Sequence, residues 1–161
     1  MKEKNINISK EELKKCCTSE NWVAEMSMRM PFNTKQDLFD HSEKVWYSLD
    51  KPDWLEAFSG HPKIGDIGSL NEKFSSTKDI AEYEQSGIND ASVNCLEELI
   101  KHNEEYERKF GYIFIVCATG KTADEMLSMI KSRIKNNPQD EISIAMEEQN
   151  KITKLRLDKL A

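Results

Sequence analysis

The 161-residue sequence has few residues that break helices, only four prolines and six glycines, and it has no long hydrophobic run. Its longest stretch without a polar side chain is Ile113–Ala118, far below the roughly 20 residues that a membrane-spanning helix needs. The first residues lack the apolar region of a signal peptide. No repeat or low-complexity segment is present. We therefore expect one globular domain, residues 1–161, without a membrane segment.

An excess of positive charge is also absent. The chain has 23 Lys and Arg residues against 29 Asp and Glu residues, which gives a formal net charge of −6. The basic residues are interleaved with acidic ones, whereas proteins that bind phosphate backbones gather their basic residues into a patch. We therefore expect no nucleic-acid partner.

The four cysteines, Cys16, Cys17, Cys95 and Cys117, show no CxxC spacing. This pattern indicates reduced thiols in a reducing compartment and no zinc site. The chain ends in Lys159–Ala161 and not in the peroxisomal signal Ser-Lys-Leu, so we expect a cytoplasmic location. The motifs GxGxxG, GxxxxGK[ST], HExxH and GxSxG are missing as well, which removes support for nucleotide binding, zinc proteolysis and α/β-hydrolase chemistry.

Signals for helices recur along most of the chain. Ser9–Glu12 and Thr122–Glu125 have the spacing of capping boxes, and Ser19 and Thr34 stand where N-caps are expected. Apolar residues follow at helical spacing. The predicted helices cover about 9–17, 19–30, 34–49, 52–58, 77–84, 90–110, 122–135 and 140–160. The sequence thus predicts an all-α, single-domain helical bundle of seven to nine helices.

Two segments depart from this pattern. Ser59–Gly68 holds three of the six glycines and Pro62, a composition typical of an ordered loop. Tyr112–Cys117 has the residue types of a buried strand, but no second strand is predicted that could pair with it. We expect it to be a buried segment that is partly helical or extended.

The candidate chemical groups are His61, the pair Glu84–Gln85 and Arg156. His61 precedes Pro62, which biases the histidine away from helical geometry, and an imidazole titrates near neutral pH. An inward-facing Arg156 would suit a carboxylate. Plainer interpretations stay open: a histidine at a helix end, a surface Glu-Gln pair, and an arginine that interacts with a helix dipole. His41 and His102 are interpreted as solvated histidines on helix faces.

Four ordered motifs together point to one family. They are His61-Pro-Lys-Ile-Gly-Asp66, Glu84-Gln-Ser-Gly87, the run from Tyr106 to Gly120, and Lys151-Ile-Thr-Lys-Leu-Arg-Leu157. This order resembles the OHCU decarboxylases, the 2-oxo-4-hydroxy-4-carboxy-5-ureidoimidazoline decarboxylases of urate catabolism. The resemblance extends from Met30 to the C-terminus, and Arg133 and Glu141 also fit the family pattern.

The resemblance implies an all-α fold, a homodimer, and decarboxylation of OHCU to (S)-allantoin without a cofactor or metal. It implies that His61 and Glu84 are catalytic and that Arg156 binds the substrate. The adjacent Pro62 and Gln85 are expected to contact the substrate too. Backbone groups that bind the substrate ring would come from Phe114, Ile115, Val116 and Cys117.

The sequence departs from the family at Ala81, where some relatives have serine three residues before the glutamate. The missing hydroxyl could come from Ser75, Ser76 or Thr77, or the substrate could be a related ureide. Two further alternatives are a helical protein-binding module derived from this fold, with an exposed apolar face near Trp22 or Trp46, and a redox sensor at Cys16–Cys17. The sensor would require a depressed thiol pKa.

Overall fold

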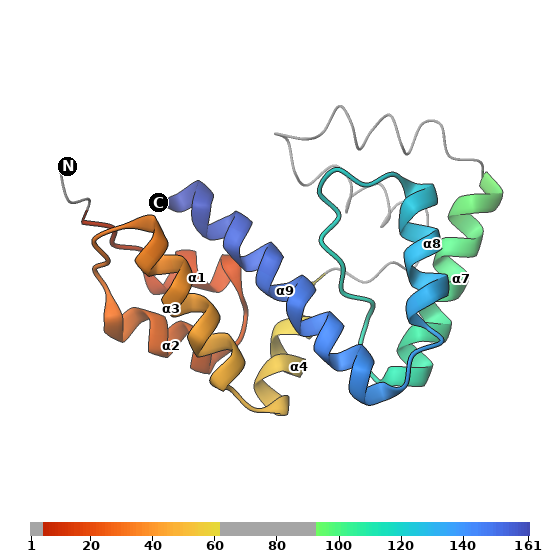
Figure 1. Cartoon of the computed structure of the whole chain (residues 1–161), viewed down its shortest axis with the longest axis horizontal. Coiled ribbons are helices and arrows are strands. Elements are labelled where there is room, and N and C mark those ends of the chain that lie inside the picture. Colours follow the sequence, from red (N-terminus) through yellow and green to blue (C-terminus); the bar gives the residue numbers. More distant parts are fainter. Residues whose placement is uncertain (1–4, 62–92) are drawn as a thin grey trace. The chain divides into compact units, whose positions relative to one another are not determined.

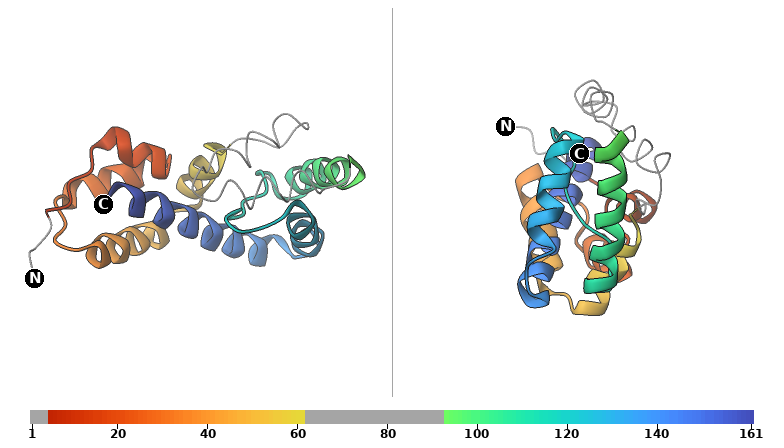
Figure 2. Two further views of the ribbon diagram at one scale, coloured as in Figure 1. Left: turned by 90° about the horizontal axis from the view of Figure 1, so that it is seen from above. Right: turned by 90° about the vertical axis from the view of Figure 1, so that its right-hand side faces the viewer.

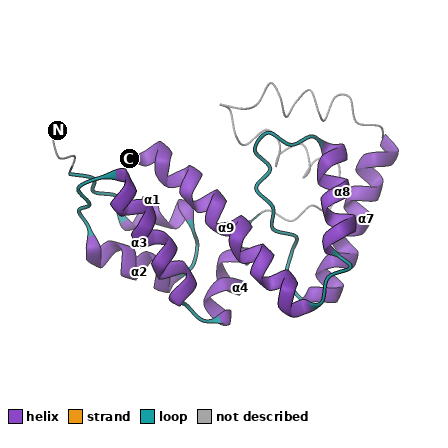
Figure 3. Cartoon of the chain, viewed as in Figure 1, coloured by secondary structure: helices purple, strands orange, loops and turns teal. Residues whose placement is uncertain are grey.

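The computed structural model describes residues 5–61 and 93–161, and these ranges contain seven helices and, apart from one isolated bridge between Ile6 and Phe32, no β-structure (Figures 1 and 3). The all-α class is thereby confirmed. The helix predicted over 77–84 and the start of the helix predicted over 90–110 lie outside the described residues. The helices are α1 Lys10–Cys16, α2 Glu20–Arg29, α3 Lys35–Ser48, α4 Lys51–Ser59, α7 Val93–Phe110, α8 Ala123–Arg133 and α9 Pro138–Leu160.

The predicted helix starts in the first part of the chain are confirmed by their hydrogen bonds. Ser9 and Glu12 form the reciprocal capping box of α1. The hydroxyl groups of Ser19 and Thr34 accept from the first turns of α2 and α3. Each cap satisfies a backbone N–H that has no partner inside its helix.

One helix start and one capping box differ from the prediction. The last helix begins at Pro138 and not at Asp140, because the Asn137 side chain accepts from the Asp140 N–H and caps the helix earlier. At α8, the Thr122 hydroxyl accepts from the Glu125 N–H, but the reciprocal bond of a capping box is not formed. At both helix starts a short polar side chain is the cap, which the sequence predicted at Thr122 but not at Asn137.

The chain forms two compact units, of which the first contains residues 1–60 and 146–161. In this unit α3 lies antiparallel to the C-terminal part of α9 (Figures 1 and 2). Contacts recur about once per helical turn, because residues three and four apart share one face of a helix. From one end to the other they are Lys35–Asp158, Phe39–Lys154, Glu43–Asn150 and Trp46–Met146.

Trp46 anchors the lower end of this helix pair. Its ring is buried, and its Nε1 donates to the Met146 carbonyl at 3.0 Å. Its own carbonyl accepts from Nε1 of Trp54 on α4 at 2.9 Å. The Phe58 ring packs edge-on against Trp46. A buried tryptophan thus gains apolar burial while its polar N–H remains satisfied.

The second unit contains residues 61–145. Its helices α7 and α8 lie side by side and run in the same direction (Figures 1 and 2), so the chain must travel back along them before α8 begins. Tyr112–Cys117, called the return segment below, makes this passage without helix or strand structure. Extended backbone covers about 3.3 Å per residue against 1.5 Å in a helix, so a few residues suffice.

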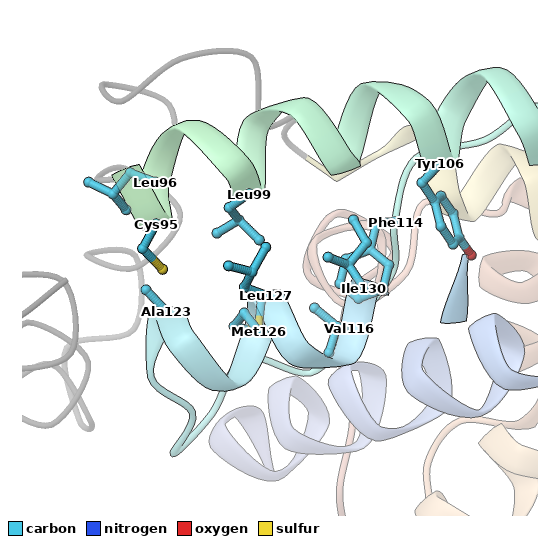
Figure 4. Close-up of a cluster of buried hydrophobic side chains, with 10 residues drawn as sticks. All are labelled: Cys95, Leu96, Leu99, Tyr106, Phe114, Val116, Ala123, Met126, Leu127 and Ile130. Carbon is cyan, nitrogen blue, oxygen red and sulfur yellow. The ribbon is translucent and has the colours of Figure 1, made fainter. Parts of the chain in front are cut away.

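The core of this unit lies between α7, α8 and the return segment. Figure 4 shows its side chains arranged in pairs along the two helices, from Cys95 and Ala123 at one end toward Tyr106 at the other. Phe114 and Val116 of the return segment belong to the same cluster. The segment is therefore buried by the two helices that it connects.

At the end of α4, Gly60 makes a close approach to Thr18. A Cβ atom at Gly60 would lie 2.2 Å from Thr18 Oγ1 and 2.6 Å from Thr18 Cγ2. The Thr18 hydroxyl itself donates to the carbonyls of Glu56 and Ala57. Its side chain therefore has a fixed place against the last turn of α4, directly before His61.

We expect Gly60→Ala to destabilise the protein by about 1–3 kcal/mol, because the added methyl group overpacks this contact. The free energy of unfolding, measured by urea denaturation, tests this. In a Thr18→Ala background the same glycine substitution should cost clearly less, since the two nearest atoms are gone. An equal cost in both backgrounds would contradict the steric explanation.

Candidate functional site

His61 follows the C-cap residue Gly60 in a bend and is half-buried. The helix ends here because the Gly60 N–H already bonds back to the carbonyls of Ala57 and Phe58. The prediction that His61 stands just beyond a helix end is thus confirmed. Pro62, Glu84 and Gln85 lie outside the described residues, as does Ala81.

Successive side chains of the return segment alternate between the α7–α8 core and positions outside it. The side chains of Phe114 and Val116 enter the α7–α8 core, whereas Ile115 and Cys117 are buried outside that cluster. An alternation of period two is typical of extended backbone. Of the two conformations that the sequence left open, the structure shows the extended one.

Two positively charged side chains bind the carbonyls of this segment. Arg133 Nη1 donates to the Ile115 carbonyl and Lys121 Nζ to the Cys117 carbonyl, each at 2.7 Å. Carbonyls two residues apart point to the same edge of an extended chain. One edge of the return segment is therefore occupied by side chains of the protein.

The opposite edge carries the N–H and C=O of Val116 and the N–H of Ala118. Among the described residues these three groups make no hydrogen bond. Buried backbone groups normally have a partner. The row presents a donor, an acceptor and a donor, which fits a planar ligand in which an N–H lies between two acceptor atoms.

Arg133 is held by a buried network. Its Nε and Nη2 donate to Glu141 Oε2 at 2.8 and 2.6 Å, and Glu141 is fully buried. The hydroxyl group of Tyr106 donates to the same carboxylate oxygen, and Asn136 Nδ2 donates to the other oxygen at 3.1 Å. The guanidinium also lies 4.4 Å from the centre of the Phe114 ring.

The electrostatics of this network follow from its burial. Removal from water, together with the hydrogen bond to the Glu141 carboxylate, raises the pKa of Tyr106 far above its ordinary value. The pKa of the nearby Tyr112 rises to about 12, mainly through burial. Both phenols thus stay protonated, and that of Tyr106 serves as a hydrogen-bond donor.

Arg156 lies on α9 in the first compact unit, whereas His61 and the return segment belong to the second. Its Nη1 donates to the carbonyls of Lys15 and Cys16, at the C-terminal end of α1, at 3.2 and 3.4 Å. Its interaction with a substrate carboxylate or carbonyl stays a prediction, as does its convergence with His61 and Glu84.

The structure contradicts two alternatives drawn from the sequence. Trp22 and Trp46 are buried, so neither indole can contribute to the exposed apolar face that a binding module would use there. Burial raises the pKa of Cys16 to about 11 and that of Cys17 to about 12, despite the nearby Arg156 charge. A redox-sensing thiol needs a depressed pKa and access to solvent, and these two cysteines have neither.

His41 also differs from its prediction as a solvated residue. Its ring packs 5.6 Å from that of Phe32, and within the described residues its buried Nε2 has no hydrogen-bond partner. Burial lowers the pKa of His41, and the charges of Arg29 and Lys44 lower it further. His102 is half-buried on α7, and its Nδ1 lies 2.7 Å from the Glu98 carbonyl.

Sequence reasoning missed Lys121 as part of this site and assigned no contact to Arg133. One signal was available for Arg133: it follows Met126 and Ile130 at the spacing of one apolar helix face, so it had to point into the core.

In the parts of the chain that the structure describes, no group of His, Cys, Asp or Glu residues could hold a metal ion. The same parts contain no helix long and apolar enough to cross a membrane.

Comparison with known proteins decides the family. Residues 7–158 match the family model described as OHCU decarboxylase. The chain belongs to the OHCU decarboxylase family. The resemblance carried by the four sequence motifs is thereby confirmed.

Individual members of the OHCU decarboxylase family support this assignment. The chain is 38% identical over 158 residues to the uric acid degradation bifunctional protein TTL of Arabidopsis thaliana, covering 96% of this chain and 48% of that protein. A 2-oxo-4-hydroxy-4-carboxy-5-ureidoimidazoline decarboxylase of Haloferax volcanii is 23% identical over 139 residues. This alignment covers 84% of this chain and 79% of the Haloferax protein. The chain thus spans about half the length of the Arabidopsis relative.

A solved structure has the same fold. A crystal structure of OHCU decarboxylase in the presence of (S)-allantoin superposes with a TM-score of 0.77 at 38% identity. The match covers 95% of this chain and 98% of the other. The overall fold described above is therefore one that this family uses.

The network around Arg133 leads to a stability prediction. Glu141→Gln keeps the shape of the side chain but leaves the buried guanidinium without its counter-charge, and we expect a loss of about 3–5 kcal/mol. Urea unfolding followed by circular dichroism measures it.

The matched control is Asp158→Asn, which removes one partner of the exposed Lys35–Asp158 pair. This change should cost about 1 kcal/mol or less, because water screens exposed pairs. Equal losses for the two variants would show that burial does not strengthen the Arg133–Glu141 contact.

Proposed function

We propose that this protein converts OHCU to (S)-allantoin and CO₂ in urate degradation, without a cofactor. The match of the family model over residues 7–158 carries the proposal. The Haloferax relative supports it further, because it bears the name of this decarboxylase and 79% of its length aligns here.

The substrate explains why its decarboxylation needs no cofactor. In OHCU the carbon that bears the hydroxyl and carboxylate groups neighbours a C=N bond. As CO₂ leaves, the electron pair of the broken C–C bond forms a C=C bond, and the former C=N pair moves to nitrogen, which takes up a proton. The enol hydroxyl then loses a proton, while the ureido-bearing carbon gains one on a single face, which yields (S)-allantoin.

The return segment provides a surface for the substrate ring. The ring N–H of OHCU lies between a carbonyl and the hydroxyl-bearing carbon, so this edge presents an acceptor, a donor and an acceptor. The row formed by Val116 and Ala118 has the complementary order. This match supports the assignment of backbone groups within Phe114–Cys117, and of the adjacent Ala118 N–H, to substrate binding.

We assign the remaining roles by chemistry. His61 acts as the general acid and base, because an imidazole gives and takes protons near neutral pH. Glu84 orients His61 or the substrate and favours the imidazolium form. Arg156 binds the ring carbonyl or the carboxylate. Pro62 and Gln85 complete the contacts, and with Ala81 in place of serine a decarboxylase of a related ureide is the second candidate.

We also propose that the chain forms one OHCU decarboxylase domain, works as a homodimer and is cytoplasmic. One family model spans most of the chain, which supports a single domain. All four cysteines lie in the described ranges and none forms a disulfide, as is usual in a reducing cytosol. Exposed apolar side chains in the first unit, among them Met28 at 73% exposure, would gain from burial in a dimer.

The activity is tested by generating OHCU in situ with urate oxidase and hydroxyisourate hydrolase. OHCU decays by itself to racemic allantoin, so only an enzyme produces a growing circular-dichroism signal. We expect this signal from the wild-type protein. A slow, optically silent decay with wild type would overturn the proposed function and favour a related ureide as substrate.

His61→Ala should lower turnover by about 10²–10⁴-fold, because the proton-transfer group is lost, while helical content stays intact. His102→Ala is the matched control, since its imidazole contacts the carbonyl of Glu98 within its own helix. This control should keep wild-type turnover. Wild-type activity in His61→Ala would remove His61 from the mechanism.

For the dimer, sedimentation equilibrium at micromolar concentration should give twice the mass of the chain. The expected driving force is burial of apolar surface, so the association should weaken in Met28→Glu. A single-chain mass for the wild-type protein at this concentration would contradict the dimer.

A further inference from the structure

The side chains that hold the return segment donate their hydrogen bonds to its backbone, and Arg133 also lies over the ring of Phe114. Arg133 donates to the Ile115 carbonyl and Lys121 to the Cys117 carbonyl. The two carbonyls are two residues apart and point to one edge of the extended chain. Both contacts therefore act on the orientation of a peptide group.

The geometry of the peptide bond extends this effect to the other edge. A trans peptide is planar, and its C=O and N–H point in opposite directions. The one cis peptide among the described residues precedes Pro31, so both peptides here are trans. A carbonyl of Ile115 directed at Arg133 consequently directs the N–H of Val116 away from it, and Lys121 does the same for the N–H of Ala118.

Arg133 is suited to this task because its own position is fixed. Two of its nitrogens bind Glu141, whose second oxygen is bound by Asn136. The planar guanidinium has a rigid set of donors, so when one side is fixed the remaining donor has a fixed direction. The contact with the Phe114 ring restricts it further.

We propose that Arg133 and Lys121 are positioning residues, which aim the Val116 and Ala118 N–H groups at the acceptor atoms of the substrate ring. This inference rests on the proposed function, in which this edge binds the substrate. The competing explanation is that both side chains only stabilise the fold. The two explanations differ in what happens to ligand binding when one carbonyl loses its donor.

The test uses Arg133→Lys and Lys121→Met in the full chain. Lysine keeps a positive charge opposite Glu141 but lacks the fork that reaches both Glu141 and Ile115. Lys121 is only partly buried, so its replacement leaves the core intact. Lys109→Met is the matched control, because Lys109 Nζ also donates to backbone carbonyls of this unit, those of Ile134 and Asn136, but not to the return segment.

Turnover is measured with the circular-dichroism assay at varied OHCU concentration. A weakened hydrogen bond to the ring affects ground state and transition state alike, so KM should rise about three- to tenfold while kcat changes by less than about twofold. Lys109→Met should leave KM unchanged. If wild type turns over but both test variants keep the wild-type KM, the positioning role is wrong, whatever their melting temperatures.

A second readout identifies the peptide that moves. With (S)-allantoin as the added probe, the amide ¹H–¹⁵N signals of Val116 and Ala118 should shift in the wild-type protein. Arg133→Lys should reduce the shift of Val116 more than that of Ala118, and Lys121→Met the reverse. Uniform changes at both amides in both variants would overturn the proposal.

The outcomes separate the two levels of inference. A wild-type protein without turnover overturns the proposed function, and this inference falls with it. An active wild type with unaffected variants overturns only the positioning role. If Arg133→Lys does not fold, Lys121→Met and the Ala118 signal decide.

Discussion

The second compact unit depends on how the chain returns between two helices that run in the same direction. The return segment is buried, but in the described part of the chain it has no neighbouring strand to satisfy its backbone. Each buried carbonyl without a partner would cost about 1–3 kcal/mol. Arg133 and Lys121 supply the donors that a neighbouring strand would give to two carbonyls of the return segment. Glu141 in turn neutralises Arg133, and Tyr106 and Asn136 donate to the Glu141 carboxylate.

In the first unit the helix starts depend on local contacts. Its N-caps use residues adjacent in sequence, and the antiparallel pair of α3 and α9 repeats one contact per turn. Long-range polar contacts in this unit mostly end on backbone carbonyls, as with Trp46 Nε1 on Met146 and the Thr18 hydroxyl on Ala57. The Thr18 contact fixes the last turn of α4 and thereby the backbone from which His61 leaves the helix.

This contrast explains how much could be predicted from the sequence. Ser9, Ser19 and Thr34 were predicted as caps because a cap depends on three or four neighbouring residues. The conformation of Tyr112–Cys117 stayed open because it is decided by the separation and direction of α7 and α8, which no local pattern encodes. Lys121 was missed for the same reason, since its partner is a carbonyl whose direction is known only once the segment is extended.

The candidate site shows the same division. His61 was predicted from its proline and the helix end before it, and the family motifs predicted the other polar groups, whereas the row of backbone groups at Val116 and Ala118 has no side-chain signature. Any apolar residue can supply a backbone N–H. A binding site made of backbone groups can therefore be detected in a sequence only through the side chains that orient that backbone. In our proposal Arg133 is a residue of this kind.

A buried ion pair is often no more stabilising than an apolar pair of similar volume, because both charges must leave water. An apolar residue in place of Arg133 would pack against Phe114 but would leave the Ile115 carbonyl without a donor and the Glu141 carboxylate without a counter-charge. A lysine would supply the charge but not three directed bonds. Arginine is therefore the residue that can bind one carbonyl, one carboxylate and one aromatic face at the same time. The direction that Arg133 gives to the peptide group comes from the geometry of its guanidinium and not from its charge alone.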